Sequence, residues 1–86
     1  MPDYTIYFTR SARKELEALD GTIVRLIFPR IRSLGAEPRP SGCRKLQGDD
    51  RLWRIRIGDY RVVYRISDQN EQVDIISVRH RRDAYR

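Results

Sequence analysis

LWRIRIGDYRVVYRI, residues 52–66, is the stretch that decides the fold predicted for this chain. Apolar and charged side chains alternate on both sides of Gly58-Asp59. A Gly-Asp pair between two alternating runs is typical of a two-residue hairpin turn, because glycine readily adopts the positive φ that such turns need. The register that follows pairs Ile57 with Tyr60, Arg56 with Arg61, Ile55 with Val62, and Arg54 with Val63.

Successive residues of a strand point to opposite faces, so this hairpin has two different sides. The apolar side carries Trp53, Ile55, Ile57, Tyr60, Val62, Tyr64 and Ile66. The other side, which we call the arginine face, carries Arg54, Arg56, Arg61 and Arg65 around Leu52 and Val63.

The arginine face places like charges opposite each other, which weakens a strand pair by a few tenths to about 1 kcal/mol. We expect this face to carry no carboxylate that relieves the repulsion. A solvated surface is one interpretation. A bound anion with several oxygens explains the uniform charge better, because paired guanidinium donors match phosphate oxygens and stay charged at any working pH.

Arginine also dominates the charge of the whole chain, with 16 Arg against 2 Lys and a formal net charge of +6. The chain has 86 residues, of which 40% are hydrophobic, and this is enough for one small folded domain, residues 1–86. The expected partner is an anion, with nucleic acid as the leading class.

The remaining composition bears on location and metal chemistry. The single Cys43 forms no internal disulfide, which is consistent with a reducing cytoplasm. The N-terminus lacks the pattern of a signal peptide, and no segment approaches the ~20 apolar residues of a membrane span. Cys43 and His80 are too few for a zinc site and no carboxylates cluster, so we expect neither a metal nor another cofactor.

One strand and two helices are predicted before the hairpin. Alternation over residues 4–9 indicates the strand, and Ser11 is expected to cap a helix over residues 12–19. Thr22 is expected to cap the second helix, and its buried face is marked by Ile23, Ile27, Ile31 and Leu34.

Pro29 interrupts the pattern of this second helix. An interior proline removes a hydrogen bond and clashes with the preceding turn, at about 3 kcal/mol. We therefore expect a kink near residues 25–28, or two short helical pieces, with an end at Gly35.

Residues 44–46 predict a short strand before the hairpin, and residues 72–78 predict a last strand after it. Two helices between a first strand and a later antiparallel meander indicate an α+β domain. The two helices are expected to form a hairpin that can cover one face of the sheet.

Four segments together carry a family resemblance: KLQG at residues 45–48, WRIR at 53–56, GDYRVVY at 58–64 and HRRDAYR at 80–86. In this order and spacing they resemble the RelE/ParE superfamily, the small toxins of bacterial and archaeal toxin–antitoxin pairs. The resemblance spans the whole chain in element order and is most specific over residues 45–86.

The resemblance implies a RelE-like fold, with an N-terminal strand and a helical hairpin packed on a twisted antiparallel sheet. It also implies a type II toxin of the RelE branch: a ribosome-dependent, metal-independent endoribonuclease that cuts mRNA in the ribosomal A site. The implied partners are the 70S ribosome, mRNA and a cognate RelB-like antitoxin with an acidic segment.

The resemblance assigns catalytic roles to Arg54, Arg56, Arg61, Arg81 and Tyr85. Well-studied members carry lysines at the positions of Arg54 and Arg56, and one of these is proposed as the general base. Arginine is a poor base, since it stays protonated at working pH. Either positioning and charge suffice here, or another group takes the proton, such as Lys45 with a pKa lowered by neighbouring cations. Further RNA contacts are expected from Lys45, Arg65, His80, Arg82 and Arg86.

Two other functions remain open from the sequence. One is a ParE-like toxin that poisons DNA gyrase without nuclease activity, and the other is a degenerate member that only binds its antitoxin. Arg61 together with Arg81 and Tyr85 favours the nuclease, since gyrase poisons generally lack that combination.

Overall fold

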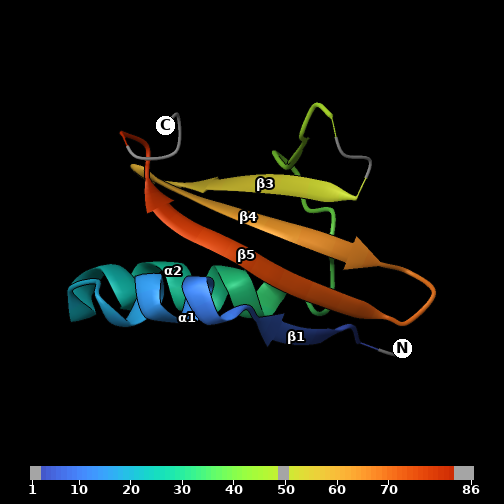
Figure 1. Cartoon of the computed structure of the whole chain (residues 1–86), viewed down its shortest axis with the longest axis horizontal. Helices are drawn as coiled ribbons and strands as arrows, with labels where there is room; N and C mark the ends of the chain where they lie inside the picture. The colour runs from blue at the N-terminus through green and yellow to red at the C-terminus, as the bar shows by residue number, and fades with distance from the viewer. Residues whose placement is uncertain (1–2, 49–50, 83–86) are drawn as a thin grey trace.

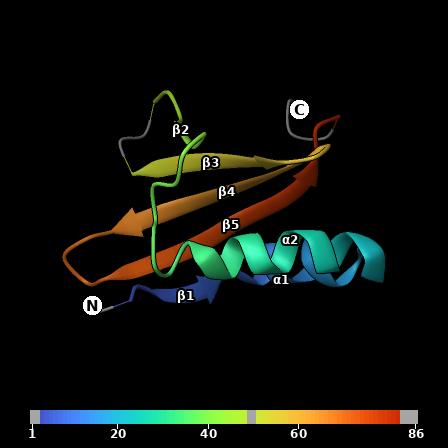
Figure 2. The same cartoon turned by 180° about the vertical axis from the view of Figure 1, so that it is seen from behind.

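The structure, a computed structural model, describes residues 3–48 and 51–82. A five-stranded sheet lies on two helices that cover one of its faces, which confirms the predicted α+β class (Figures 1 and 2). The elements in chain order are β1 (Thr5–Phe8), α1 (Arg10–Glu17), α2 (Gly21–Ser33), β2 (Arg44–Lys45), β3 (Leu52–Ile57), β4 (Tyr60–Ser67) and β5 (Gln72–His80).

The hairpin β3–β4 forms in the predicted register. Ile57 pairs with Tyr60 and Arg56 with Arg61, and the pairing continues to Leu52 and Arg65. Gly58 has a φ of 59°, whereas Asp59 is not among the residues with positive φ, and this combination is that of a type II′ turn with glycine first. Turn chemistry within the hairpin was therefore enough to set the register.

The sheet order β1-β5-β4-β3-β2 corrects one part of the prediction. β1 pairs with β5 in parallel, with Thr5 opposite Gln72 and Phe8 opposite Ile75, so the sheet is not wholly antiparallel. The reason is that the helical hairpin carries the chain away from β1, and β5 returns to it only after the meander. Parallel neighbours require such a long crossover.

The core lies between the sheet and the helices. Its buried side chains come from α1, α2, the residue after α2 and the strands β3 to β5: Ala12, Ile27, Ile31, Leu34, Ile55, Ile57, Val62, Tyr64, Ile66, Val73, Ile75 and Val78. The predicted apolar side of the hairpin is thus the side that packs on the helices. Trp53 is only half-buried, and the guanidinium of Arg39 lies 5.1 Å from the centre of its ring.

Both helices begin earlier than predicted. Thr9, not Ser11, caps α1, and its Oγ1 accepts a hydrogen bond from the N–H of Ala12 at 3.2 Å. Asp20, not Thr22, is the N-cap of α2. Thr9 has the extended backbone that an N-cap requires, so the first suitable side chain after β1 starts the helix.

α2 is one continuous helix with Pro29 inside it, so the expectation of two short pieces is wrong. Pro29 lies on the exposed side of α2, as does Arg25, whose carbonyl would otherwise accept from an N–H at position 29. No helix among residues 3–48 and 51–82 is long and apolar enough to cross a membrane.

Candidate nucleic-acid interface

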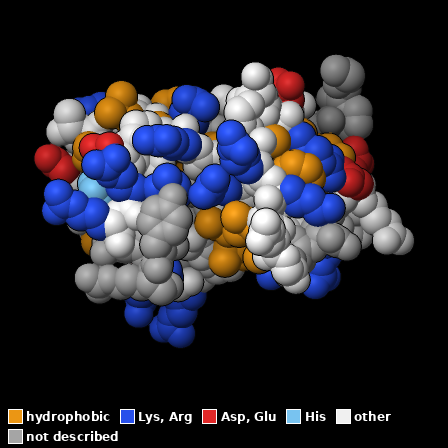
Figure 3. Space-filling model, turned by 90° about the horizontal axis from the view of Figure 1, so that it is seen from above, with side chains coloured by type: hydrophobic (Ala, Val, Ile, Leu, Met, Phe, Trp, Pro, Cys, Tyr) orange, Lys and Arg blue, Asp and Glu red, His pale blue; other side chains and the backbone are white. Residues whose placement is uncertain are grey.

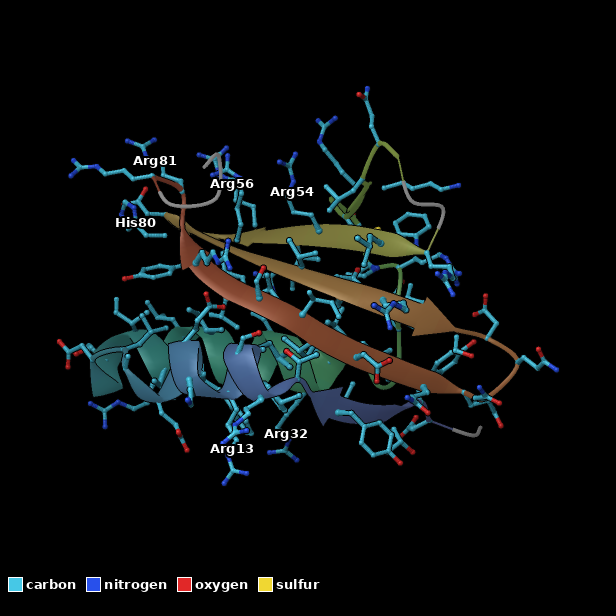
Figure 4. The ribbon with its side chains drawn as sticks, viewed as in Figure 1. Arg13, Arg32, Arg54, Arg56, His80 and Arg81 are labelled. Atoms are coloured by element: carbon cyan, nitrogen blue, oxygen red, sulfur yellow. The ribbon has the colours of Figure 1, made fainter. Side chains whose placement is uncertain are left out.

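The face of the sheet that the helices leave uncovered carries the arginines of the hairpin. Arg54 and Arg56 point away from the helices, and Arg81, just beyond β5, lies on the same side of the molecule (Figure 4). A view onto this side shows Lys and Arg side chains across its middle, with acidic side chains toward its margins (Figure 3). A continuous basic surface of this kind attracts a polyanion.

Arg61 lies at the centre of this face. It is directly opposite Arg56 on one neighbouring strand and directly opposite Arg79 on the other, so the three residues form one row across β3, β4 and β5. Arg61 is only 9% exposed and is the one charged residue that is buried among the described residues. A buried guanidinium between two others is held in place by its surroundings, which is the condition for preorganised charge stabilisation.

Arg79 was not among the predicted site residues. The last strand was expected to end at Val78, but β5 continues to His80. A bulge also shifts the register beside Val63 and Tyr64, so that Val63 pairs with Ser77 whereas Tyr64 pairs with Ile75. The extra residue resets the alternation of β5, turning Val78 into the core and Arg79 to the arginine face. Nothing in the local sequence signals that shift.

We expected no carboxylate on the arginine face, and this was wrong, because two carboxylates from other elements contact its arginines. The Oε2 atom of Glu15 on α1 lies 2.7 Å from Nε of Arg79, and an oxygen of Asp74 lies 3.9 Å from Arg65. Among the residues that the structure describes, no carboxylate lies within 4.0 Å of the guanidinium groups of Arg54 or Arg56. Their charges therefore remain available to an anion.

Arg81 is fastened to the hairpin turn. Its backbone N–H donates to the carbonyl of Asp59 at 2.7 Å, and its Nε lies 3.9 Å from the Asp59 carboxylate. The turn between β3 and β4 thus holds the chain after β5 beside the arginine face. This contact brings together Arg56 and Arg81, two of the catalytic residues predicted from the resemblance, at one end of the sheet (Figure 4).

Lys45 and His80 are turned to the other side of the sheet. Lys45 pairs with Trp53, and His80 pairs with Tyr60, two residues of the apolar side of the hairpin. The rings of His80 and Tyr60 meet edge to face at 5.3 Å, beside a hollow of about 540 Å³ that Glu15 also lines. The neighbour of Lys45, Arg44, pairs with Arg54 and so belongs to the arginine face.

The other predicted contacts lie around this centre. Arg65 is half-exposed on the arginine face and lies on the same strand as Arg61, four residues further along β4. Arg82 is exposed after β5, and its N–H donates to Nδ1 of His80 at 3.2 Å. Tyr85 and Arg86 lie outside the described residues.

Comparison with known proteins gives consistent results. Residues 6–85 match the family model of the ParE toxin of type II toxin–antitoxin system, parDE. Toxin RelG of Mycobacterium tuberculosis (strain ATCC 25618 / H37Rv) is 37% identical over 87 residues, covering 96% of this chain and 97% of its own.

Solved structures share the fold. The toxin–antitoxin complex RelBE2 of M. tuberculosis contains a chain that is 31% identical, with a TM-score of 0.80 over 91% of this chain and 98% of that chain. The isolated RelE toxin of E. coli is 28% identical, with a TM-score of 0.80 over 90% of this chain and 83% of that chain.

Proposed function

Since this chain belongs to the RelE/ParE superfamily and is a RelE-like toxin of a type II toxin–antitoxin system, we propose that it is an endoribonuclease that cuts mRNA on the ribosome. The observation that carries the proposal is the row of Arg56, Arg61 and Arg79, with Arg54 and Arg81 on the same side. These donors form a basic surface for the phosphates of a single strand, with Arg61 at its buried centre.

The proposed reaction is attack of a ribose 2′-oxygen on the adjacent phosphorus. The new O2′–P bond forms as the P–O5′ bond breaks, and the products are a 2′,3′-cyclic phosphate and a free 5′-hydroxyl. The 2′-hydroxyl loses its proton and the leaving 5′-oxygen gains one. Negative charge grows on the non-bridging oxygens, where fixed cations lower the barrier by about 3 to 4 kcal/mol for each well-placed donor.

We assign Arg56 and Arg61 to these non-bridging oxygens and Arg81 to the leaving side, with Arg54 on a neighbouring phosphate. The assignment rests on Arg56 and Arg61 being cross-strand neighbours and on Arg81 being tied to the turn beside them. Since arginine does not give up its proton, these residues supply charge and not proton transfer. The arginines also meet the charge of the phosphate, so we propose a mechanism without a metal.

The ribosome supplies the remaining positioning in this proposal. Holding a 2′-oxygen in line with the phosphorus contributes several kcal/mol to the barrier reduction, and a codon in the A site is held in one geometry. A toxin with charge stabilisation but no dedicated base depends on such positioning. We therefore propose that free mRNA is a poor substrate.

We further propose that a cognate antitoxin, acidic in its toxin-binding segment, silences this toxin. The support is the net charge of +6 and the similarity to RelBE2 of M. tuberculosis, whose structure is a toxin–antitoxin complex. A disordered acidic segment that orders on binding would neutralise the basic surface.

Primer extension on mRNA tests the proposed reaction. Purified toxin is incubated with one message, with and without programmed ribosomes. We expect discrete cuts within translated codons only where ribosomes are present, and 5′-hydroxyl ends at each cut. Equal cleavage of free and ribosome-bound mRNA would contradict the ribosome dependence, whereas intact mRNA in both would contradict the nuclease.

A gyrase poison is the second candidate, because the matching family model describes ParE toxins. The two functions give different products in cells that express the toxin. Double-strand DNA breaks with intact mRNA would identify the gyrase poison, and cut mRNA with intact DNA would identify the nuclease.

A further inference from the structure

The short strand β2 adds an arginine to the arginine face that has no role so far. Arg44 lies directly opposite Arg54 of β3 and therefore projects to the same side of the sheet. Arg44 is exposed, and no carboxylate of the described residues lies within 4.0 Å of its guanidinium group. Arg44 and Arg54 thus present two adjacent positive charges to a ligand.

This pair lies next to the central row of Arg56, Arg61 and Arg79. Arg54 and Arg56 are two residues apart on the same face of β3, which separates their positions by about 7 Å. Successive phosphates of an extended single strand have a similar spacing. A nucleic acid with one phosphate at the central row therefore brings the next phosphate within reach of Arg44 and Arg54.

The charges of the two rows follow a diagonal line across the sheet. The central row is charged from β3 to β5, whereas the second row continues from Arg54 to Val63 on β4 and Ser77 on β5, which carry no charge. The charge of the second row is thus confined to β2 and β3. A line of charges from β5 to β2 suits a strand of several phosphates, whereas a compact anion needs one row only.

An exposed charge on an edge strand has a simpler explanation, since charged side chains keep the edge of a sheet from pairing with another chain. That role needs a charge at the edge and gains nothing from a second arginine directly opposite on β3. The opposed pair costs a few tenths to about 1 kcal/mol. A phosphate shared by the two guanidinium groups removes this cost, because their paired donors match its oxygens.

We propose that Arg44 and Arg54 together bind the phosphate of the message that lies one nucleotide upstream of the cut. The proposal rests on the proposed nuclease and adds the path and the polarity of its substrate. Arg81, Arg56 and Arg54 follow one another along the molecule (Figure 4). With Arg81 at the leaving 5′-oxygen, the message continues downstream past Arg81, and its upstream part passes Arg54 and Arg44.

Binding of an uncleavable single strand tests the site without the reaction. A short 2′-O-methyl RNA oligonucleotide, whose blocked 2′-oxygen cannot attack, is titrated with toxin at several salt concentrations. For Arg44→Ala the slope of log K against log[salt] should be smaller in magnitude by about 0.7, which is the contribution of one phosphate contact to a single strand. Equal slopes for Arg44→Ala and the wild type would overturn the proposal.

Arg32→Ala is the matched control for this titration. It removes the same charge from α2, where Arg32 points away from the sheet on the side opposite to Arg54 and Arg56 (Figure 4). Its slope should equal that of the wild type. An equal reduction of the slope by Arg32→Ala and Arg44→Ala would show an effect of net charge alone and would also overturn the proposal.

A neutral linkage at one position of the message tests which phosphate is bound. Two synthetic messages carry a single methylphosphonate, one upstream and the other downstream of the scissile phosphate, and both are presented on programmed ribosomes. On the unmodified message, Arg44→Ala should raise the toxin concentration at half-maximal cleavage rate about three- to fivefold. The upstream methylphosphonate should abolish this difference from the wild type, and the downstream one should preserve it. A difference that persists on the upstream-neutral message would overturn the proposal, because Arg44 would then contact another phosphate of the message or the ribosome.

The two measurements separate this inference from the proposed function. Failure of the wild-type toxin to cut any of the messages would contradict the nuclease, whereas the salt dependence of oligonucleotide binding decides the Arg44 site without the reaction. Normal cleavage by the wild type together with unchanged binding and cleavage by Arg44→Ala would overturn the site alone.

Discussion

Arg61 is a buried cation between two others, Arg56 on β3 and Arg79 on β5. Directly opposed like charges cost a strand pair a few tenths to about 1 kcal/mol each. Glu15 offsets part of this cost at Arg79. In the proposed nuclease, phosphate oxygens would also meet the charges of this row.

Truncation of Arg61 separates chemistry from stability. For Arg61→Ala we expect cleavage of ribosome-bound mRNA to fall about 10²- to 10³-fold, since one charge-stabilising donor is lost. The free energy of unfolding should change by less than about 1 kcal/mol, because relief of repulsion offsets the lost contacts of the Arg61 side chain. Cleavage assays and urea denaturation measure the two quantities.

Val62→Ala is the control at the next position of β4. Its side chain points into the core and is fully buried, so we expect a loss of about 2 kcal/mol in stability with cleavage retained below the melting transition. An Arg61→Ala toxin that is fully active but clearly destabilised would refute the assignment of Arg61 to the phosphate.

At the scale of elements, α1 takes the place of a strand along part of β5. β1 pairs only with Gln72–Ile75, so the edge of β5 beyond Ile75 would be open. Glu15 of α1 closes it: one carboxylate oxygen accepts from the N–H of Val78 at 3.0 Å, and the other accepts from Nε of Arg79 at 2.7 Å. One side chain therefore satisfies a buried backbone donor and fixes an arginine at the end of the central row.

Removal of the Glu15 carboxylate should destabilise the fold. For Glu15→Ala we expect a loss of about 1 to 3 kcal/mol, because the N–H of Val78 loses its acceptor in a buried place. Glu15→Gln should lose less, since the amide oxygen still accepts from that N–H. Glu17→Ala is the control on the same helix, because its exposed pair with Arg13 is worth at most about 0.5 kcal/mol. Equal effects of the two alanine variants in thermal denaturation would contradict this role for Glu15.

At the scale of the whole molecule, the turns at the two ends of β4 have different roles. The turn at Gly58-Asp59 lies at the arginine face, whereas the turn after β4 holds Asp68 in a structural network. The Asp68 carboxylate accepts two hydrogen bonds from Arg39, at 2.8 and 3.1 Å, and one from the hydroxyl of Tyr4 at 2.7 Å. This network joins the residue before β1, the loop before β2 and the turn before β5.

The Asp68 network should make stability depend on pH below about 4. The hydrogen bonds from Arg39, and then that from Tyr4, lower the pKa of Asp68 to about 2. The unfolded carboxyl has a pKa near 3.9, so the network stabilises the fold above that pH and loses its effect as pH falls toward 2. Because Asp68 is exposed to solvent, we expect about 1 kcal/mol or less.

Comparison of the melting temperatures of Asp68→Asn and the wild type checks this dependence of stability on pH. The difference in melting temperature should be constant from pH 5 to 7 and shrink as pH falls from about 4 to 3. Cleavage at neutral pH should be unaffected, since the network lies at the far end of the hairpin from Arg81. A difference that stays constant down to pH 3 would show that Asp68 does not titrate as described.

The sequence by itself determined the hairpin, the arginine face and the α+β class. These follow from neighbouring residues: the alternation of residues 52–66, the positive φ of Gly58 and the 3–4 spacing of Ile23, Ile27 and Ile31. Each of these patterns lies within one helix or one pair of neighbouring strands. Local chemistry is therefore enough to determine the structure that it forms.

Only the tertiary structure decided how the distant segments meet. The parallel pairing of β1 with β5 and the contact of Glu15 with Arg79 each join segments more than 60 residues apart. The bulge that turns Arg79 outward depends on how β4 pairs with β5, and the side of the sheet on which Lys45 lies depends on its pairing with Trp53. Such contacts are selected by the packing of the whole core, because a strand shifted by one residue reverses every side chain it presents.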